Sequence, residues 1–450
     1  MLIAGDQARL PLAVGNFFDW HPAEHSNMAT NLAVSAASPL SSESADRSAL
    51  KARLRRVQRL GKLKALGLIA PLFVFLLVVF IAPIAILLTR SVDNHEVPAV
   101  LGKTAAAIAG WDGQDLPSET VYAAFVADLE AAPRSTVAEL AKRLNYYQSG
   151  LRSLVLKTAR GTSTAEGASP KATLLSIDER WGDPATWRIV QRALPAYTDF
   201  YLLASLDLRR DAQGHIGVAK DESAIYVEVI ARTFYISIAV TLICLVLGYP
   251  LAYLISTLPP QRAGLLLIMV LLPFWTSLLV RTTAWVVVLQ GEGVVNTFLG
   301  WLGLIDKEHP LALIHNRVGV LIAMTHILLP FMILPIYSVM KNIPPSYMRA
   351  ASSLGASPVR AFLRVYVPLS LPGVSAGCLL VFILALGYYI TPALVGGPHD
   401  QMLSYFIAYF ANQVTNWGMA AGLSAILLGL VLILYAVYSR IVGLDRLRIG

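Results

Sequence analysis

Six long apolar runs, separated by polar stretches, dominate the pattern of this 450-residue chain. Each run exceeds the roughly 20 apolar residues that a helix needs to cross a bilayer. The predicted spans are residues 65–89, 233–257, 263–289, 318–340, 369–395 and 418–439. The pattern therefore predicts an all-α, polytopic membrane protein with six transmembrane helices.

The composition agrees with this prediction, since 56% of the residues are hydrophobic, 14% are charged and the mean hydropathy is +0.60. The net charge of +8 does not indicate nucleic-acid binding, because the basic residues lie beside apolar runs and no aromatic and basic surface pattern accompanies them. Contact with the lipid membrane is expected instead. Cys244 and Cys378 lie inside apolar runs, where they are expected to act as small hydrophobic residues.

The first 64 residues are predicted to be cytoplasmic. Residues 1–46 are rich in alanine, serine, asparagine and aspartate and show no helical period, so they are expected to be largely disordered. Met28 is an alternative start of the protein. Residues 47–64 contain eight lysines and arginines directly before the first span, which places this end of the chain in the cytoplasm.

The polar segment of residues 90–232 follows the first span and is therefore expected on the outer, periplasmic side. Thr136 and Glu139 have the spacing of a capping box, and apolar residues from Val137 to Leu154 recur at helical spacing. Asp183 and Pro184 predict the start of a further helix, whose apolar face consists of Trp187, Val190 and Leu194. Because a structureless loop of this length is uncommon, we expect a mainly helical external insert.

The remaining chain, residues 233–444, is expected to form the transmembrane core. The loops at 290–317 and 396–417 carry the acidic residues and fall outside, whereas the turn at 259–262 and the basic tail fall inside. The tail contains Arg440, Arg446 and Arg448. Both termini are therefore predicted to be cytoplasmic, in a multi-pass protein of the bacterial inner membrane.

Between the fourth and fifth spans lies a basic loop, residues 343–368, which contains three arginines and no acidic residue. Ser346 is predicted to cap a first short helix, and Gly355 to end it in the left-handed conformation. Ser357 is predicted to cap a second helix that begins at Pro358 and is limited by Pro368. The excess of positive charge places this loop in the cytoplasm.

No residue pattern in the chain predicts catalysis. The sequence contains no GxxxxGK[ST] phosphate-binding loop, no HExxH motif and no paired cysteines or histidines at metal-ligand spacing. His326 lies within a span, where a polar contact between helices is favoured over a metal ligand. The chain is therefore not expected to be an enzyme or to hold a metal or cofactor of its own.

The basic loop resembles the EAA loop of binding-protein-dependent ABC importer permeases, whose pattern is E-A-A, a glycine four residues later, then a phenylalanine and a proline. The matching residues are Ala350, Ala351, Gly355, Ser357, Phe362 and Pro368, with Arg349 at the usual glutamate position. The resemblance implies a MetI-like ABC permease fold. It also implies that this loop docks in a groove of a cytoplasmic ATPase subunit, and Arg349 then changes the ionic partner of the contact.

Three further stretches are similar to the spermidine/putrescine, or polyamine/opine, subgroup of these permeases: residues 248–253, 272–282 and 386–397. No aspartate or glutamate lies within the six predicted spans. A polyamine path would therefore depend on aromatic faces or on a partner's carboxylates. Arg281 lies inside the third predicted span, where an ionisable side chain is costly. Structural pairing is the favoured role for it, and the alternative is that it lines the path of a substrate that bears a carboxylate. The candidate path residues are Trp275, Arg281, Trp285, Tyr388 and Tyr389.

The resemblance implies a permease subunit that carries a small organic solute across the inner membrane, either a polyamine such as spermidine or putrescine or an opine-like compound. The implied partners are a cytoplasmic ABC ATPase dimer that hydrolyses ATP, a second permease subunit and a periplasmic solute-binding protein. Two alternatives are an ion-coupled secondary transporter and a membrane sensor whose ligand domain is the insert. The first would need carboxylates within the spans or an inverted repeat, and neither is seen. The second would not need five further spans.

Overall fold

The computed structural model describes residues 61, 64–162, 169–211, 214–219, 224–306 and 309–442. The segment predicted to be disordered, nearly all of the basic run before the first span, and Arg446 and Arg448 lie outside these described residues. The chain divides into two units, Met1–Val78 and Val79–Gly450. In the first unit, residues 64–76 are helical.

The first apolar helix extends over Lys64–Thr89, which is long enough to cross a membrane. It passes through a π-helical turn, Leu77–Ile81, and ends with α2, Ala82–Thr89. Pro83 lies at the start of α2 and lacks an N–H group, so the wider turn before it accommodates a residue that cannot donate within the helix.

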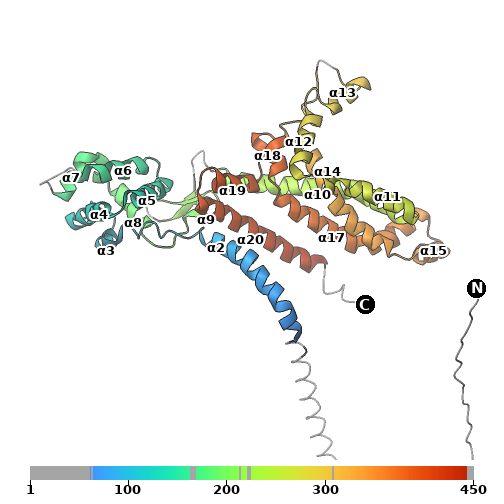
Figure 1. Cartoon of the computed structure of the whole chain (residues 1–450), viewed down its shortest axis with the longest axis horizontal. Helices are drawn as coiled ribbons and strands as arrows, with labels where there is room; N and C mark the ends of the chain where they lie inside the picture. The colour runs from blue at the N-terminus through green and yellow to red at the C-terminus, as the bar shows by residue number, and fades with distance from the viewer. Residues whose placement is uncertain are drawn as a thin grey trace, which may run out of the picture. The chain divides into compact units, whose positions relative to one another are not determined.

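The insert between the first two apolar helices is mainly helical in its described part (Figure 1). Its helices are α3 (Gly102–Ile108), α4 (Glu119–Ala131), α5 (Arg134–Tyr147), α6 (Leu151–Gly161), α7 (Pro170–Ile177), η3 (Glu179–Gly182), α8 (Pro184–Ala193) and α9 (Phe200–Ala204). A small antiparallel hairpin of β1 (Leu208–Arg210) and β2 (Ile216–Val218) follows, with Leu208 opposite Val218.

Two local predictions for the insert are corrected and one is confirmed. The predicted capping box is wrong, because α5 begins at Arg134 and the Thr136 hydroxyl donates to the Pro133 carbonyl within the first turn. The apolar series belongs to two helices, because Gly150 adopts the left-handed conformation, φ +91°, and separates α5 from α6. The start of α8 is as predicted: the Asp183 carboxylate accepts a hydrogen bond from the Ala185 amide at 2.8 Å.

Aromatic side chains form the centre of the insert core. Trp181 and Trp187 are fully buried with their ring centroids 5.2 Å apart, and Phe125 lies 4.8 Å from the ring of Trp181. Their polar groups are also satisfied: the Trp181 indole donates to the Thr158 hydroxyl at 2.8 Å, and the Tyr122 hydroxyl donates to the Trp181 carbonyl at 2.8 Å. A core of this kind stabilises the insert through its own contacts.

The transmembrane core consists of the helices that follow the insert. They are α10 (Tyr226–Thr257), α11 (Pro260–Leu271), η4 (Leu272–Trp275), α12 (Leu278–Leu289), α13 (Val294–Trp301), α14 (Arg317–Lys341), α15 (Pro345–Ser353), α16 (Pro358–Ala361), η5 (Phe362–Tyr366), α17 (Val367–Leu386), α18 (Ile390–Val395), η6 (Pro398–Asp400), α19 (Leu403–Asn412) and α20 (Trp417–Val442). Six helices in the described part of the chain are long and apolar enough to cross a membrane.

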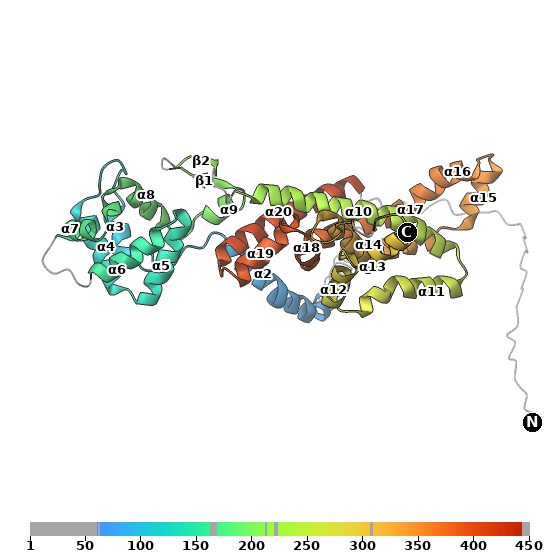
Figure 2. The same ribbon diagram turned by 90° about the horizontal axis from the view of Figure 1, so that it is seen from above.

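Helices α10, α14 and α17 pack against one another at the centre of this core (Figures 1 and 2). Glycines permit the close approach: a Cβ atom at Gly377 would lie 3.0 Å from the Met332 carbonyl oxygen, and one at Gly373 would lie 2.9 Å from that of Pro335. Contacts through small residues are the usual way in which membrane helices associate, because lipid gives no hydrophobic drive for it.

The third predicted span is corrected. Residues 263–289 do not form one helix, because α11 and η4 end at Trp275 and a new helix, α12, begins at Leu278. The Ser277 hydroxyl caps α12 by accepting a hydrogen bond from the Val280 amide at 3.2 Å. Pro273 lies just before the break and cannot donate to the preceding turn. The candidate span at this place is Leu278–Trp301, so it includes the α13 segment that was predicted as an outer loop.

Two other helix limits differ from prediction. Helix α10 begins at Tyr226, seven residues before the predicted span, and therefore includes Glu228, whose side chain is 77% exposed in the first turn. The predicted fifth span, 369–395, is interrupted after Leu386, and its last residues form the separate helix α18. Both differences arise because hydropathy shows where lipid can surround a helix but does not fix where its hydrogen bonding starts or stops.

Candidate functional site

The basic loop contains the two short helices that the sequence predicted, and their junction has the predicted geometry. Gly355 adopts φ +83°, a conformation that residues with a side chain rarely take. The Gly355 amide donates to the Ser352 carbonyl and the Ala356 amide to the Ala351 carbonyl, at 3.0 and 3.1 Å. These bonds satisfy the last carbonyls of α15 and turn the chain sharply toward α16.

The caps of the two loop helices differ from each other. Ser357 caps α16 as predicted, since its hydroxyl accepts a hydrogen bond from the Arg360 amide at 3.4 Å. Ser346 does not cap α15, because that helix already begins at Pro345 and Pro344 occupies the cap position without a side-chain bond. The double proline sets the backbone at this helix start in place of a serine cap.

The prediction that Pro368 limits the second helix is wrong. A π-helical turn, Phe362–Tyr366, joins α16 to α17, and Pro358–Leu386 is one apolar helix. In this turn the Val367 amide donates to the Phe362 carbonyl, one residue further back than in an α-helix. The extra residue accommodates Pro368, which has no N–H group and would otherwise clash with the carbonyl four residues before it.

An aromatic cluster fixes the loop to the transmembrane core. The Phe362 ring lies 5.3 Å from the ring of Tyr253 on α10 and 5.6 Å from that of Tyr366, measured between centroids. The Tyr366 hydroxyl lies 3.4 Å from the Ser256 hydroxyl, and that of Tyr249 lies 3.0 Å from the hydroxyl of Ser370. The packed rings and these hydroxyl contacts therefore join the loop to α10 and α17.

The outer surface of the loop, in contrast, is exposed and partly apolar. Leu354 is 89% exposed at the bend, and Val359 is 68% exposed on α16. None of the residues of α15 is buried, and Arg349 makes no side-chain hydrogen bond or ion pair with the described residues. Exposed apolar groups therefore lie beside cations on a fixed bend, an arrangement typical of surfaces that contact a protein partner.

The predicted path residues are only partly brought together. The Trp285 indole donates to His326 Nδ1 at 3.1 Å and thereby joins α12 to α14, so His326 makes the polar contact between helices that the sequence favoured. The Arg281 guanidinium lies close enough to His326 and Tyr388 to act on both electrostatically. Arg281, Trp285 and Tyr388 therefore belong to one region of the core.

The other two predicted path residues lie apart from that region. Trp275 is 75% exposed at the end of η4, and none of the contacts among the described residues joins it to the pair of Trp285 and His326. Tyr389 is 41% exposed just before α18. Arg281 itself donates to the Thr276 carbonyl at 3.0 Å, which satisfies a backbone group at the break before α12. This contact is structural, and a role of Arg281 in the substrate path stays a prediction.

Sequence reasoning missed an ion pair between Arg317, at the start of α14, and Asp400. Their Nε and Oδ1 atoms are 3.0 Å apart, and Asp400 is only 5% exposed. The other Asp400 oxygen accepts a hydrogen bond from the Gly397 amide at 3.3 Å. The signal was present as one acidic residue after a Gly-Gly-Pro turn, but only the fold shows that Arg317, 83 residues earlier, reaches it.

Comparisons with known proteins agree with this architecture. Residues 231–444 match the family described as binding-protein-dependent transport system inner membrane component. The chain is 36% identical over 222 residues to the spermidine/putrescine transport system permease protein PotB of Escherichia coli strain K12, covering 49% of this chain and 80% of the relative. It is 33% identical over 234 residues to the inner membrane ABC transporter permease protein YdcU of the same strain, covering 49% and 73%.

Among solved structures, a bacterial alginate ABC transporter in complex with an alginate pentasaccharide-bound periplasmic protein is similar, with a TM-score of 0.41 and 17% identity over 49% of this chain and 78% of that one. The curated relatives are transport permeases and not enzymes. The insert up to residue 230 lies outside the family match. The chain is a multi-pass inner membrane protein of the binding-protein-dependent transport family, and thus a permease subunit of an ABC importer.

Proposed function

We propose that this permease moves polyamines inward and that its basic loop receives the force for this from a cytoplasmic ATPase dimer. The observation that carries the proposal is the shape of the loop: a left-handed bend at Gly355 displays Leu354 to solvent, while Phe362 fixes the same loop to α10. A partner bound at the bend can therefore move the transmembrane core. ATP is hydrolysed by that partner, and the chain itself needs no cofactor.

Topology is part of the proposal. Both termini and the basic loop lie in the cytoplasm, because the loop carries Arg349, Arg360 and Arg364 without an acidic residue. The insert then lies in the periplasm, on the side of the solute-binding protein. A second permease subunit completes the path and covers exposed apolar surface of the membrane helices, such as Leu432 and Ile433 of α20.

The polyamine substrate rests on the names of the relatives and on the aromatic residues near the path. Trp285 and Tyr388 offer ring faces to a cation, each contributing about 0.5–2 kcal/mol. The carboxylates that a polyamine also requires would come from the second permease subunit. Uptake of labelled spermidine and of an opine-like competitor into proteoliposomes with the complete assembly separates the two substrate classes. Uptake of the opine-like compound alone would reject the polyamine assignment.

The coupling role is tested with Gly355→Val in the assembly of permeases, ATPase and binding protein. Valine at a left-handed position strains the backbone by about 1–3 kcal/mol, which distorts the bend. We expect at least a tenfold loss of solute-stimulated ATP hydrolysis. Gly303→Val is the matched control, because Gly303 has φ +71° and, like Gly355, no atom within 4 Å of an added Cβ. It should retain hydrolysis within about twofold, and full hydrolysis by Gly355→Val would refute the coupling role.

A further inference from the structure

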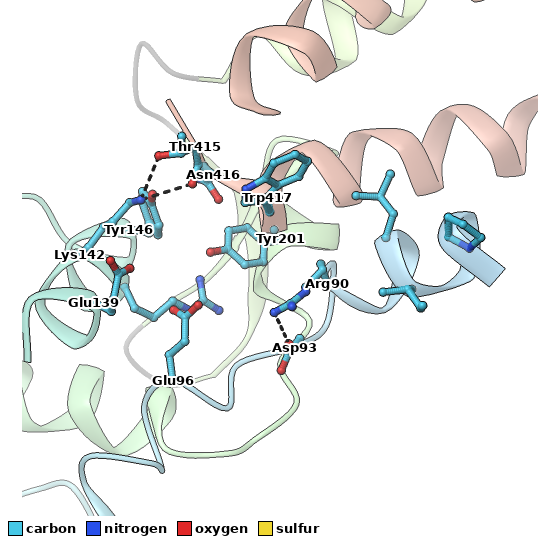
Figure 3. A pocket seen from close by; sticks show the side chains of 15 residues that line it. Arg90, Asp93, Glu96, Glu139, Lys142, Tyr146, Tyr201, Thr415, Asn416 and Trp417 are labelled. Carbon is cyan, nitrogen blue, oxygen red and sulfur yellow. Dashed lines mark hydrogen bonds and ion pairs between the residues drawn. The ribbon is translucent and has the colours of Figure 1, made fainter. Parts of the chain in front are cut away.

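A cavity of about 670 Å³ lies where the first apolar helix ends and the insert begins. Its walls come from the last turns of α2, from α5 and α9 of the insert, and from the start of α20 (Figure 3). This cavity is distant in sequence from the basic loop and from the pair of Trp285 and His326, and neither the family match nor the names of the relatives assign it a role.

One wall of the cavity is apolar and belongs to a membrane helix. Pro83, Ile86 and Leu87 line it, and Ile86 is 63% exposed. They lie in the last two turns of the candidate span Lys64–Thr89, so this wall is at the boundary between hydrocarbon and head groups. The opposite walls are polar. A cavity that is apolar toward the bilayer and polar toward water is complementary to an amphipathic ligand, which has one apolar and one polar part.

The polar part of the cavity contains two carboxylates that no described residue engages. Glu96 and Glu139 line the cavity, and neither accepts a hydrogen bond or forms an ion pair with any residue that the structure describes. Figure 3 shows both carboxyl groups at one side of the cavity, with Arg90 at the other. Asp93 differs from them, because Arg90 pairs with it at 3.1 Å. The two glutamates are therefore available to a ligand that donates N–H groups.

The same cavity contains a buried cation with an unused donor. Arg143 is 2% exposed; its Nε donates to the Asn94 side chain at 2.6 Å and its Nη2 to Thr198 at 3.1 Å. Its Nη1 is buried and has no hydrogen-bond partner among the described residues. The guanidinium carbon lies 4.2 Å from the centre of the Tyr201 ring, so this ring face is occupied. A buried donor of a cation without an acceptor is costly, and an anionic oxygen would relieve that cost.

Two neighbouring groups can assist the same anion. Among the described residues, Lys142 donates to the main chain and hydroxyl of Thr415 alone, at 3.3 and 3.5 Å, so its charge is not neutralised there (Figure 3). The Tyr146 hydroxyl is also buried without a partner in the described structure. Burial raises the pKa of Tyr146, so this hydroxyl stays neutral and can donate.

We propose that this cavity binds the head group of a phospholipid that carries a primary ammonium group and a phosphate, as phosphatidylethanolamine does. The ammonium group donates to Glu96 and Glu139, the phosphate accepts from Lys142 and Arg143, and the acyl chains follow the apolar wall of α2. A polyamine has no anionic group for Lys142 and Arg143. A phosphatidylcholine has no N–H donor for the glutamates, and a phosphatidylglycerol has no cation for them. Lipid binding at this cavity does not depend on which solute the permease transports.

The test is native mass spectrometry of the full-length chain in detergent, titrated with phosphatidylethanolamine, phosphatidylcholine and phosphatidylglycerol of the same acyl composition. We expect phosphatidylethanolamine to bind about tenfold more tightly than the other two. Binding that does not distinguish the three head groups would overturn the proposal. Free phosphoethanolamine and spermidine are added as competitors, and displacement of the lipid by either at equal concentration would show a site for a soluble compound instead.

Variants of the lining residues test whether the lipid binds in this cavity. Glu96→Gln/Glu139→Gln should lose the preference for phosphatidylethanolamine, and both glutamates are exposed, so folding is not at risk. Glu130→Gln is the control, since Glu130 is exposed on α4 and does not line the cavity. Lys142→Gln should weaken phosphatidylethanolamine and phosphatidylglycerol alike, whereas Lys103→Gln, outside the cavity, should not. An unchanged preference in the double variant would contradict the assignment.

Discussion

The insert and the basic loop place their large apolar side chains differently: the insert buries them, and the loop exposes them. In the insert, Trp181 and Trp187 are fully buried, and their indole groups donate within the core. In the loop, Leu354 and Val359 are among the most exposed apolar residues, and only Phe362 on its inner side is packed against the core. Contacts within the insert therefore stabilise it, whereas the outer surface of the loop stays exposed. The shape of the loop depends on one glycine and two short helices.

Because of this difference, substitutions in the two regions should affect different properties of the protein. A change inside the insert should alter stability and leave coupling to the ATPase intact as long as the insert folds. A change at the bend of the loop should alter coupling with little effect on the free energy of unfolding.

The insert core should be the most sensitive place. Trp187→Ala removes a buried ring in contact with Tyr122 and Phe125 and should destabilise the insert by about 3–5 kcal/mol. Hydrogen exchange measured by mass spectrometry on the full chain should show faster exchange across α4 to α8 and unchanged exchange in the basic loop. Trp301→Ala is a suitable control because this tryptophan is 76% exposed. Equal protection of the insert in Trp187→Ala and the control would show that the core is not self-supporting.

The junction between the insert and α20 should be the next most sensitive. A Cβ atom at Gly418 would lie 2.0 Å from Cε2 of Tyr201, whose ring is held against Arg143. Gly418→Ala should therefore force α9 away from α20 at a cost of about 1–3 kcal/mol. Gly429→Ala, on the same helix and with no atom within 4 Å of the added group, should be neutral or stabilising by up to about 1 kcal/mol. Thermal unfolding of the purified chain distinguishes them, and equal shifts would contradict the close contact.

The mostly buried carboxylate of Asp178 should give the smallest effect, with a defined pH dependence. The hydrogen bond from the Arg180 guanidinium lowers the pKa of Asp178, and Lys157 adds to this at 3.3 Å. A lowered pKa in the folded state stabilises the insert above the unfolded pKa of about 4 and is lost as the pH falls below it. Asp178→Asn should cost about 1 kcal/mol at pH 7 and much less at acid pH. Asp115→Asn, at an exposed carboxylate, is the control; if both variants respond alike to pH, the ion pair does not contribute.

Much of the fold could be predicted from patterns among residues that are close together in the sequence. Long apolar runs predict membrane helices because lipid requires both apolar side chains and internally satisfied backbones. The bend at Gly355 and the cap at Ser357 were predictable because each depends on one residue and its immediate neighbours. The start of α8 at Asp183 and Pro184 is of the same kind.

The sequence-based predictions were wrong or incomplete where contacts between residues that are distant in the sequence determine the structure. Apolar content could not show that Ser277 starts a new helix within the third predicted span. It also could not show that a π-helical turn carries the chain past Pro368. The ion pair of Arg317 and Asp400, and the cavity that unites Glu96 with Lys142, depend on residues brought together by the whole fold. Which residues line the substrate path stays a prediction.

The central claim is that the bend of the basic loop faces the cytoplasm, where the ATPase can reach it. Leu354→Cys and Leu304→Cys, in a chain with both native cysteines replaced by alanine, place single thiols at side chains that are 89% and 69% exposed. A membrane-impermeant maleimide should label the cysteine at 354 only in inverted vesicles and the one at 304 only from the periplasmic side. Labelling at 354 from the periplasmic side would contradict the account.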